Sequence, residues 1–374
     1  MDCRVNEAWE RSPPLRLFAE QGCIDVLDQT RLPLEHLRVE LRSLESCAHA
    51  ISAMLVRGAP LIGLTAAGGL AVALSAAADD TSLHRAVETL AATRPTAVNL
   101  RWALERMAAR LRVAPVADRA ALAWRLAQEL EFAEHRCCER IGEHGAALLH
   151  AAARSERARV RGCVNVLTHC NAGWLATGAW GTALAPVYRA FREGVPVHVW
   201  VDETRPRNQG ARLTAWELRE AGIPHTLVVD NAAGHLMQRG EVDLCIVGSD
   251  RTTARGDVCN KIGTYQKALA AADNAVPFHV ALPLSTIDWE LEDGISGIPI
   301  ENRPEDEVLL QQGADPGGAL HDIRQSPRGT RALNPAFDVT PARLVRSLIC
   351  EHGVFTASSE ALAPLRALAE AGRL

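Results

Sequence analysis

The stretch V-N-V-L-T-H-C-N-A-G at residues 164–173 sets the pattern for the second half of the chain. It is an apolar run of strand length that passes directly into polar residues and a glycine. Four further apolar runs follow at 197–201, 226–229, 244–247 and 278–281, with helical stretches between them at 182–193, 213–221 and 261–272. Apolar strands that alternate with helices predict a parallel sheet covered on both faces.

Polar clusters follow the ends of the predicted strands. They read T-H-C-N-A-G at 168–173, D-E-T-R-P-R-N-Q-G at 202–210, D-N at 230–231, G-S-D-R at 248–251 and S-T-I-D at 285–288, and the fourth leads into G-D-V-C-N-K-I-G-T at 256–264. Ligands in parallel α/β sheets bind beyond the carboxyl ends of the strands. Because these clusters meet at one rim, the sequence predicts a small-molecule site there.

The first half of the chain has a different character. Segments rich in Ala, Leu, Arg and Glu predict helices at 35–45, 47–54, 61–77, 82–93, 99–111 and 118–134. Two short runs at 15–18 and 24–27, on either side of Gln21-Gly22, predict a β-hairpin before them. We therefore expect a mainly helical domain at 1–153 and a sheet domain at 154–374, in which the polar segment 311–333 forms a long loop.

The composition excludes several classes of protein. The chain has 374 residues, of which 48% are hydrophobic and 23% charged, as in ordinary globular proteins. Its net charge of −5 argues against a nucleic-acid partner, because binding to phosphates favours a basic chain. Ten cysteines without a C-x-x-C pair predict buried, reduced thiols and no zinc site. The polar start of the chain shows no signal peptide, so we expect a cytoplasmic protein.

The uncharged run at 58–78 is long enough to cross a bilayer. It consists mainly of Ala and Gly, with little Leu or Ile, whereas insertion into a membrane favours Leu, Ile and Phe. The run therefore predicts a helix packed inside the protein and no contact with a membrane.

The strand ends supply a thiol, a carboxylate and cations. Cys170 precedes a predicted helix start, where backbone N–H groups favour a thiolate or an anionic ligand. Asp250 is placed to act as a general acid or base, and Arg205, Arg207 and Lys261 to hold a phosphate. Each also has a structural explanation: core packing for Cys170, a helix cap for Asp250 and surface charge for the arginines. The dinucleotide and P-loop glycine motifs are absent, which argues against NAD and ATP.

Two polar islands interrupt the helical half. Arg57 precedes the uncharged helix, whose N-terminus attracts anions. Arg94 lies in a Thr-Arg-Pro turn at 93–95, a triplet that recurs at 204–206. Two such islands predict that the smaller domain closes over the rim of the larger one, and ordinary polar turns are the alternative.

Six motifs together resemble one family. They are V-R-G-A-P at 56–60, T-H-C-N-A-G at 168–173, D-E-T-R-P-R-N-Q-G at 202–210, G-S-D-R at 248–251, N-K-I-G-T at 260–264 and N-P-A-F-D-V-T-P at 334–341. In this order they resemble the S-methyl-5-thioribose-1-phosphate isomerase family of methionine salvage, which is related to the regulatory subunits of the exchange factor for eukaryotic initiation factor 2. The resemblance implies an α/β fold with a helical N-terminal domain and a Rossmann-like C-terminal domain. It also implies a homodimer that needs no metal or organic cofactor.

The resemblance implies the chemistry as well. The family converts an aldose that carries phosphate on its anomeric carbon into the ketose, which requires the ring to open with the phosphate in place. Asp250 is then the proton donor, and Cys170 either handles the C2 proton or stabilises charge in the transition state. The substrate contacts of the family fall on Arg57, Gly58, Ala59, Arg94, Gln209, Asn260 and Lys261. An acid that works near neutral pH needs a raised pKa, so we expect domain closure to dry the surroundings of Asp250.

Several alternatives stay open at this point. Hydrogen moves from C2 to C1 either as a proton or as a hydride. The substrate can be another sugar 1-phosphate, such as 5-deoxyribose 1-phosphate or ribose 1,5-bisphosphate, and the lining around C5 distinguishes these. A non-catalytic regulatory subunit is less consistent with the sequence, because it would not need Cys170 and Asp250. The chain departs from the family pattern at 15–18, at Ser249 and at 309–331.

Lysine is rare in this chain. Lys261 and Lys267 are the only lysines among its 40 basic residues. Lys261 lies in N-K-I-G-T, at the start of the helix expected from 261, and Lys267 belongs to no motif. We interpret Lys261 as retained because a compact ammonium group near the sugar phosphate is not interchangeable with a guanidinium fork.

Overall fold

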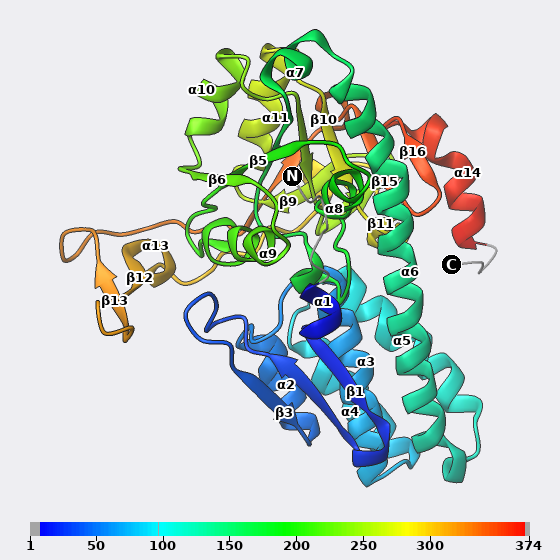
Figure 1. The fold of residues 1–374 in the computed structure, drawn as a ribbon. Coiled ribbons are helices and arrows are strands. Elements are labelled where there is room, and N and C mark those ends of the chain that lie inside the picture. Colours follow the sequence, from blue (N-terminus) through cyan, green and yellow to red (C-terminus); the bar gives the residue numbers. More distant parts are fainter. Residues whose placement is uncertain (1–7, 96, 371–374) are drawn as a thin grey trace.

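The computed structural model describes residues 8–95 and 97–370 (Figure 1). The polar start at 1–7, on which the signal-peptide expectation rests, and Thr96, beside the Thr-Arg-Pro turn, lie outside the described residues. The helix-rich N-terminal part and the sheet-containing C-terminal part occupy opposite ends of the molecule in this view.

A seven-stranded sheet forms the centre of the C-terminal part. Its order is β16-β15-β10-β7-β4-β5-β6, and every neighbouring pair is parallel except β15 with β16. The strands are β4 (Val164–Thr168), β5 (Val197–Asp202), β6 (His225–Val228), β7 (Leu244–Val247), β10 (Phe278–Ala281), β15 (Ser347–Cys350) and β16 (Gly353–Phe355). All five apolar runs expected to be strands lie in this sheet. β4, β7 and β10 are buried along their whole length, which explains their mainly apolar sequences.

Helices follow the strands of this sheet, with boundaries that differ from the expected ones. They include α8 (Ala185–Arg192), α9 (Ala215–Glu220), α10 (Ala232–Gln238) and α11 (Thr264–Asp273). A wider helical turn, Gly210–Thr214, precedes α9. The expectation that Lys261 begins a helix is wrong, because Lys261 ends the strand β9 (Val258–Lys261) and α11 starts three residues later.

A second, four-stranded sheet lies beside the carboxyl end of β7. Its order is β11-β8-β9-β14, with β11 (Ile287–Asp288), β8 (Arg251–Thr253) and β14 (Phe337–Thr340) around β9. β9 pairs with β14, which is distant in the sequence, so Lys261 lies opposite Phe337. This pairing makes a strand of residues whose local sequence suggested a helix start.

The N-terminal part has a small antiparallel sheet and four main helices. β1 (Leu15–Phe18) pairs with β2 (Cys23–Leu27), and β3 (Arg38–Leu41) pairs with the other edge of β2. The helices are α2 (Leu44–Ser52), α3 (Ala59–Ala76), α4 (Asp80–Ala92) and α5 (Val98–Val113). The helix expected at 35–45 is therefore wrong. R-V-E-L alternates polar and apolar residues, which suits a strand, and Arg38 Nε donates to Asp25 Oδ2 on β2 at 2.7 Å.

The helix α6 (Arg119–Ala153) connects the two parts of the protein. It is 35 residues long and runs beside both parts in Figure 1. Its first half contributes Ala123, Trp124 and Leu130 to the core around α3. Its second half contributes Ile141 and Leu149 to the core beneath β4 and β5. The two parts therefore share a continuous element.

The helix α3 contains most of the uncharged run that is long enough to cross a bilayer. Among the described residues it is the one helix that is long and apolar enough to span a bilayer. However, 78% of that apolar window is buried inside the protein. Gly68 and Gly69 allow close packing, because a Cβ on either would lie 2.9 Å from Ile24 or Cys47. The expected helix packed inside the protein is the observed one.

The segment expected to be a loop at 311–333 is partly ordered as a hairpin. β12 (Leu310–Ala314) and β13 (Leu320–Arg324) pair antiparallel and project from the body of the molecule (Figure 1). Asp315 caps the turn by accepting hydrogen bonds from the backbone N–H groups of Gly317 and Ala319, at 2.8 and 3.0 Å. The composition suggested a loop because the polar turn residues outweighed the short strands on either side.

Candidate active site

One pocket at the strand ends collects residues from both parts of the protein. Its lining is Met54, Arg57, Gly58, Ala59, Ile62, Arg94, Ala97, Cys170, Arg207, Gln209, Asp250, Arg251, Cys259, Lys261, Ile298, Pro299, Arg303, Ala336 and Phe337. Eight of the nine residues expected at the site lie in this lining. Asn260 does not, and its amide instead donates to Thr264 Oγ1 at 3.1 Å.

The turn before α3 brings the N-terminal part onto the pocket. Arg57 Nη1 donates to Asn171 Oδ1 at 2.7 Å, and its Nη2 donates to the Asn171 carbonyl at 3.1 Å. Gly58 has a φ of +93°, and a Cβ there would lie 2.5 Å from the Cβ of Ala176. Glycine is therefore required at this close approach between the two parts.

Cys170 occupies an unusual backbone conformation just after β4. Its φ of +67° is in the left-handed region, which costs a non-glycine residue about 1–2 kcal/mol. The surrounding residues hold this turn at both ends. Cys170 N–H donates to Thr204 Oγ1 at 2.9 Å, and Thr214 Oγ1 donates to the Cys170 carbonyl at 2.7 Å. Backbone strain of this kind is concentrated at functional sites.

The charge state of Cys170 differs from the sequence expectation. Burial raises the pKa of the Cys170 thiol above its ordinary value, while the positive charges of Arg57 and Lys261 oppose this effect. A backbone N–H group, that of Asn171, does lower this pKa in the expected direction, but desolvation is the larger influence. Cys170 is therefore a protonated thiol near neutral pH, with Arg57 Nη2 at 3.9 Å from its sulfur.

Asp250 is the last residue of the short connection from β7 to β8. Its backbone N–H donates to the Cys259 carbonyl at 2.9 Å, which ties it to β9. Burial raises the pKa of its carboxyl group, while Lys261, Arg57 and Arg94 lower it and Glu301 raises it. The direction agrees with the expected acid, because a raised pKa keeps the proton available closer to neutral pH.

Lys261 faces the pocket from the end of β9. Its Nζ donates to the Ala336 carbonyl at 2.8 Å and lies 4.6 Å from the centre of the Phe337 ring. Burial lowers the pKa of its ammonium group, whereas Cys170 and Asp250 raise it. Lys261 is therefore a nearly buried cation whose anchors are a carbonyl and an aromatic face.

The other cations of the pocket are paired with carboxylates. Glu301 lies 3.5 Å from Arg94 and 2.8 Å from Arg303, measured between charged atoms. Glu307 lies 2.7 Å from Arg207 and 2.8 Å from Arg303, and Asp288 pairs with Arg251. Among the described residues, by contrast, no carboxylate lies within 4.0 Å of the Arg57 or Lys261 nitrogens. Four arginines thus share three carboxylates, and Arg57 and Lys261 are the cations of the described lining without a direct carboxylate partner.

Gln209 offers an unused acceptor to the pocket. Its side chain is buried, and its Oε1 has no hydrogen-bond partner among the described residues. A buried amide oxygen without a partner is costly, so this atom suits a ligand hydroxyl group. Arg205, in contrast, lies outside the lining and donates to the carbonyls of Pro206 and Val308.

Several lining residues escaped the sequence reasoning. Arg303, Ile298 and Pro299 come from a segment without a recognisable motif, and no local signal marked them. Arg251 was visible as the last residue of G-S-D-R, directly after the proposed acid. Met54, Ile62 and Phe337 add apolar surface, which only the folded chain brings together.

The comparisons with known proteins agree with this geometry. A sequence profile for the Initiation factor 2 subunit family, IF-2B, matches residues 55–357. The chain belongs to this family. Methylthioribose-1-phosphate isomerase of Methylorubrum populi is 59% identical over 355 residues, which cover 94% of this chain and 96% of the relative. The resemblance to the thioribose-phosphate isomerase family that the motifs indicated is confirmed.

Two solved structures match nearly the whole chain of this family member. The crystal structure of 5-methylthioribose 1-phosphate isomerase from Pyrococcus horikoshii has a TM-score of 0.83 at 36% identity, covering 98% of this chain and 100% of that one. The translation initiation factor eIF-2B subunit delta from A. fulgidus has a TM-score of 0.77 at 38% identity, covering 94% and 98%. The expected mixed α/β fold, with a helical N-terminal region and a parallel sheet, is confirmed.

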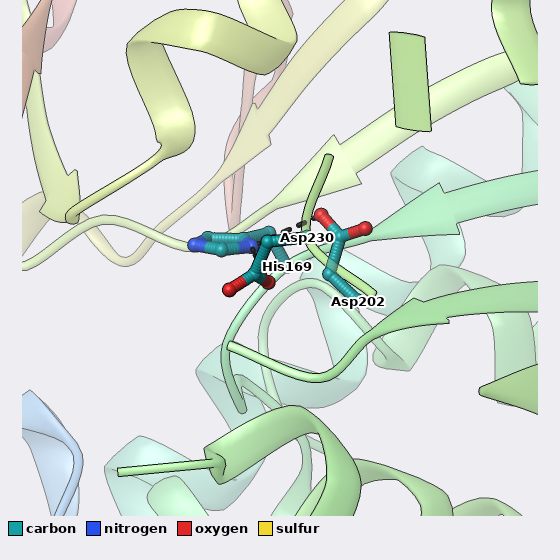
Figure 2. Close-up of side chains that lie close together, drawn as sticks. All are labelled: His169, Asp202 and Asp230. Atoms are coloured by element: carbon teal, nitrogen blue, oxygen red, sulfur yellow. Dashed lines mark hydrogen bonds and ion pairs between the residues drawn. The ribbon is translucent and has the colours of Figure 1, made fainter. Parts of the chain in front are cut away.

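Behind the pocket, this member of the Initiation factor 2 subunit family has a polar cluster that resembles a metal site. The ligand atoms of His169, Asp202 and Asp230 lie within 4.8 Å of one another, and Figure 2 shows both carboxylates beside the imidazole ring. The cluster already contains a cation, because Lys267 Nζ lies 3.4 Å from Asp202 Oδ2. Both Asp230 oxygens accept backbone hydrogen bonds, from Thr204 and Arg205. These contacts fit a metal ion poorly.

Proposed function

We propose that this protein is an aldose–ketose isomerase that converts S-methyl-5-thio-α-D-ribose 1-phosphate into S-methyl-5-thio-D-ribulose 1-phosphate, a reaction of methionine salvage. The observation that carries the proposal is the placement of Cys170 and Asp250 in one pocket with the two cations that lack carboxylate partners, Arg57 and Lys261. The names of the relatives indicate the same substrate.

The charge of the pocket suits one phosphate group. Arg57 and Lys261 together match a phosphate dianion, since the other four cations of the lining already share three carboxylates. The N-terminus of α3, at Gly58 and Ala59, adds backbone N–H groups to the same place. Arg94 and Gln209 then contact the sugar, and Asn260 supports them by fixing the turn into α11 through Thr264.

Ring opening requires a proton at the ring oxygen. Asp250 donates this proton as the bond between C1 and the ring oxygen breaks, and the ring oxygen becomes the C4 hydroxyl group. Because burial raises the pKa of Asp250, its carboxyl group holds a proton for this step closer to neutral pH than an exposed aspartate does. The C2 hydroxyl group later returns a proton as the C2 carbonyl forms, so the reaction gains and loses no atoms.

Hydrogen then moves from C2 to C1. Cys170 holds a proton at rest because burial raises its pKa, so it is poorly prepared to act as a base. This favours a hydride shift, in which the electron pair of the C2–H bond passes to C1 while the C2 hydroxyl group loses its proton and becomes the C2 carbonyl, and Arg57 holds the phosphate. Substrate deuterated at C2 tests the step: the hydride shift retains deuterium at C1, whereas proton transfer through Cys170 in water washes it out.

The apolar part of the lining suits the methylthio group. Met54, Ile62, Ile298 and Phe337 provide a wall for a non-polar substituent on C5. A sugar 1,5-bisphosphate would need a second uncompensated basic cluster, and Arg207, Arg251 and Arg303 are paired instead. 5-Deoxyribose 1-phosphate, with a smaller apolar C5 group, is the alternative substrate that this wall also accommodates.

We propose the following organisation around this activity. The chain comprises a mainly helical domain at 1–153 with an N-terminal hairpin and a catalytic domain at 154–374. The order β6-β5-β4-β7-β10-β15 supports a Rossmann-like sheet. The enzyme works in the cytoplasm as a homodimer without a metal or organic cofactor, and it binds neither nucleic acid nor membrane.

A turnover assay tests the function. Purified protein is supplied with methylthioribose 1-phosphate, 5-deoxyribose 1-phosphate and ribose 1,5-bisphosphate, and ketose formation is followed. We expect the largest kcat/KM with the first substrate and none above background with the bisphosphate. No ketose from methylthioribose 1-phosphate would refute the proposal and leave the non-catalytic role of the initiation-factor relatives.

A further inference from the structure

Lys267 is one of the largest side chains that the fold buries completely. It lies on α11 with 2% of its surface exposed, and its Nζ is 3.4 Å from Asp202 Oδ2 at the end of β5. Asp202 is wholly buried as well, and its Oδ1 has no hydrogen-bond partner among the described residues. A buried ion pair contributes little net stability, because both charges lose their hydration. The pair therefore calls for an explanation other than stability.

His169 connects this pair to the pocket. Its Nδ1 lies 3.0 Å from Asp202 Oδ2, and its Nε2 lies 2.8 Å from the carbonyl oxygen of Ile262. Both ring nitrogens thus face oxygen acceptors, and the geometry is satisfied when each nitrogen carries a proton. Figure 2 shows the imidazole ring beside the carboxylates of Asp202 and Asp230.

The His169 residue and the Ile262 carbonyl that its ring contacts each lie next to a pocket residue in the sequence. His169 directly precedes Cys170, which is held in the left-handed conformation. Ile262 directly follows Lys261, and its N–H donates to the same Ala336 carbonyl that accepts from Lys261 Nζ. The His169 ring therefore links the turn that carries the Cys170 thiol to the end of β9, which carries the Lys261 ammonium group.

The residues around the His169 ring are closely packed, so the ring has little freedom to move. A Cβ on Gly263 would lie 3.2 Å from Lys267 Nζ and 3.3 Å from His169 Cε1, so this turn fits tightly against both side chains. Thr204 adds a second tie, since its Oγ1 donates to the Asp202 carbonyl and accepts from Cys170 N–H. The Cys170 turn is therefore tied to the end of β5 by the Asp202 backbone, through Thr204, and by the Asp202 carboxylate, through His169.

We propose that Lys267 is a positioning residue: by neutralising Asp202 it fixes His169, and His169 holds the Cys170 turn against the Lys261 turn. The inference rests on the proposed function, because the reaction is what requires the thiol and the ammonium group to keep their relative places. Without the Lys267 ammonium, Asp202 is a buried carboxylate that only His169 neutralises, and the ring is drawn away from Ile262.

The test is a double-mutant cycle on turnover. Lys267→Met removes the charge at similar length, and Asp202→Asn keeps an acceptor for His169 without its charge. Each variant is assayed at a temperature 20 °C lower than its own Tm. Under these conditions we expect Lys267→Met to lower kcat at least tenfold and to keep KM within threefold of the wild-type value. Adding Asp202→Asn is expected to bring kcat back to within about threefold, because the balance of charge is restored.

Arg119→Met is the matched control. Arg119 is another buried cation paired with one aspartate, Asp80 at 2.7 Å, and it lies among the N-terminal helices away from the pocket. We expect this variant to lose Tm and keep its kcat. If Lys267→Met behaves in the same way, Lys267 is only structural and the proposal is overturned.

The double variant decides the question if Lys267→Met does not fold. It leaves no unpaired charge in the cluster, so the proposal expects a folded protein with kcat near that of wild type. A double variant that folds without activity, or that does not fold, overturns the proposal.

A readout independent of turnover separates this inference from the proposed function. Alkylation of Cys170 by iodoacetamide, followed by mass spectrometry of its peptide, reports on the position and environment of the thiol. We expect Lys267→Met to change this rate at least fivefold and Arg119→Met to leave it unchanged. Unchanged alkylation in Lys267→Met overturns the inference, whereas absence of turnover in the wild-type protein refutes the proposed function alone.

Discussion

The two lysines of this chain stand six residues apart and have opposite surroundings. Lys261 faces the pocket, and its anchors are the Ala336 carbonyl and the Phe337 ring, so its charge is available to a ligand. Lys267 faces the cluster behind the pocket, and its charge is opposed by Asp202. One region therefore keeps unbalanced charge for binding, and the other balances its charge internally.

This difference shows how to separate binding from support in a buried polar region. Both lysines are nearly inaccessible, so burial does not distinguish them. The distinction lies in which groups complete their hydrogen bonds and charges within the protein. A pocket group that lacks a hydrogen-bond or charge partner within the protein is prepared for a ligand. A group whose charge is paired within the protein instead orients its neighbours.

The largest effect is expected at the acid of the pocket. Asp250→Asn removes the proton that opens the ring, so kcat should fall about 1,000-fold while Tm changes little, since general acid catalysis supplies factors of this order. The measurements are steady-state turnover and thermal unfolding. Asp79→Asn is the control, because asparagine also caps a helix and Asp79 caps α4 away from the pocket. Normal turnover by Asp250→Asn would exclude its role as the acid.

Cys170→Ala is expected to have the next largest effect. Removing the thiol beside the hydrogen-transfer step should lower kcat about 100-fold. Alanine also tolerates the left-handed turn no better than cysteine, so the turn keeps its cost. Cys163→Ala is the matched control, because that thiol is half-buried and lies outside the pocket lining. If both alanine variants turn over alike, the pocket has been assigned the wrong thiol.

Lys261→Arg tests the pocket side of the comparison directly. The larger, planar guanidinium group must fit a nearly buried position between the Ala336 carbonyl and the Phe337 ring. We expect KM to rise about tenfold, which corresponds to the partial loss of one charged hydrogen bond. The exposed Arg110 supplies the reverse exchange, Arg110→Lys, which should leave KM unchanged. Unchanged kinetics in Lys261→Arg would attribute the retained lysine to coding bias.

Much of the fold was predictable because a strand that is buried on both faces of a sheet has a mainly apolar sequence. β4, β7 and β10 are buried and mainly apolar, and each was recognised. β3 was not, because its four residues alternate only twice and are rich in helix-forming types. The end of β9 at Lys261 was not visible either, since its partner β14 lies about 75 residues away and a local pattern does not record such pairing.

The sequence likewise identified some residues of the site and missed others. Motifs identified Cys170 and Asp250, but the thiolate expected at Cys170 ignored desolvation, which only the folded protein reveals. Arg303 reaches the pocket from a segment without a motif. Lys267 carried one signal, the rarity of lysine in the chain, and that signal became informative only once the position proved to be buried.

A smaller effect is expected from Glu301, which pairs with Arg94 and Arg303 at the edge of the pocket. Its negative charge raises the pKa of Asp250, so Glu301→Gln should lower that pKa. Asp250 acts in its protonated form, and activity is lost as pH rises through its pKa. The alkaline limb of kcat/KM should therefore move to lower pH by up to about one unit. A shift to higher pH would contradict the acid role.

The smallest effect concerns Glu217, a wholly buried carboxyl group that accepts hydrogen bonds from Asn171, Trp174, Leu175 and Tyr188. Burial raises its pKa to about 7 from 4.5, so the folded protein binds this proton more tightly than the unfolded chain. Stability should therefore fall as pH rises from about 4.5 to about 7 and level off above. At about 1.4 kcal/mol per pKa unit, this group accounts for about 3 kcal/mol.

Thermal unfolding across pH measures this contribution. Glu217→Gln cannot ionise, so its Tm should vary less between pH 4.5 and 7 than that of the wild type, whatever constant loss the missing hydrogen bonds cause. Glu217 orients Asn171, which in turn receives Arg57, so the charged group behind the pocket again acts through its neighbours. Parallel pH profiles for the two proteins would mean that Glu217 remains ionised in the fold and that its four donors stabilise the carboxylate.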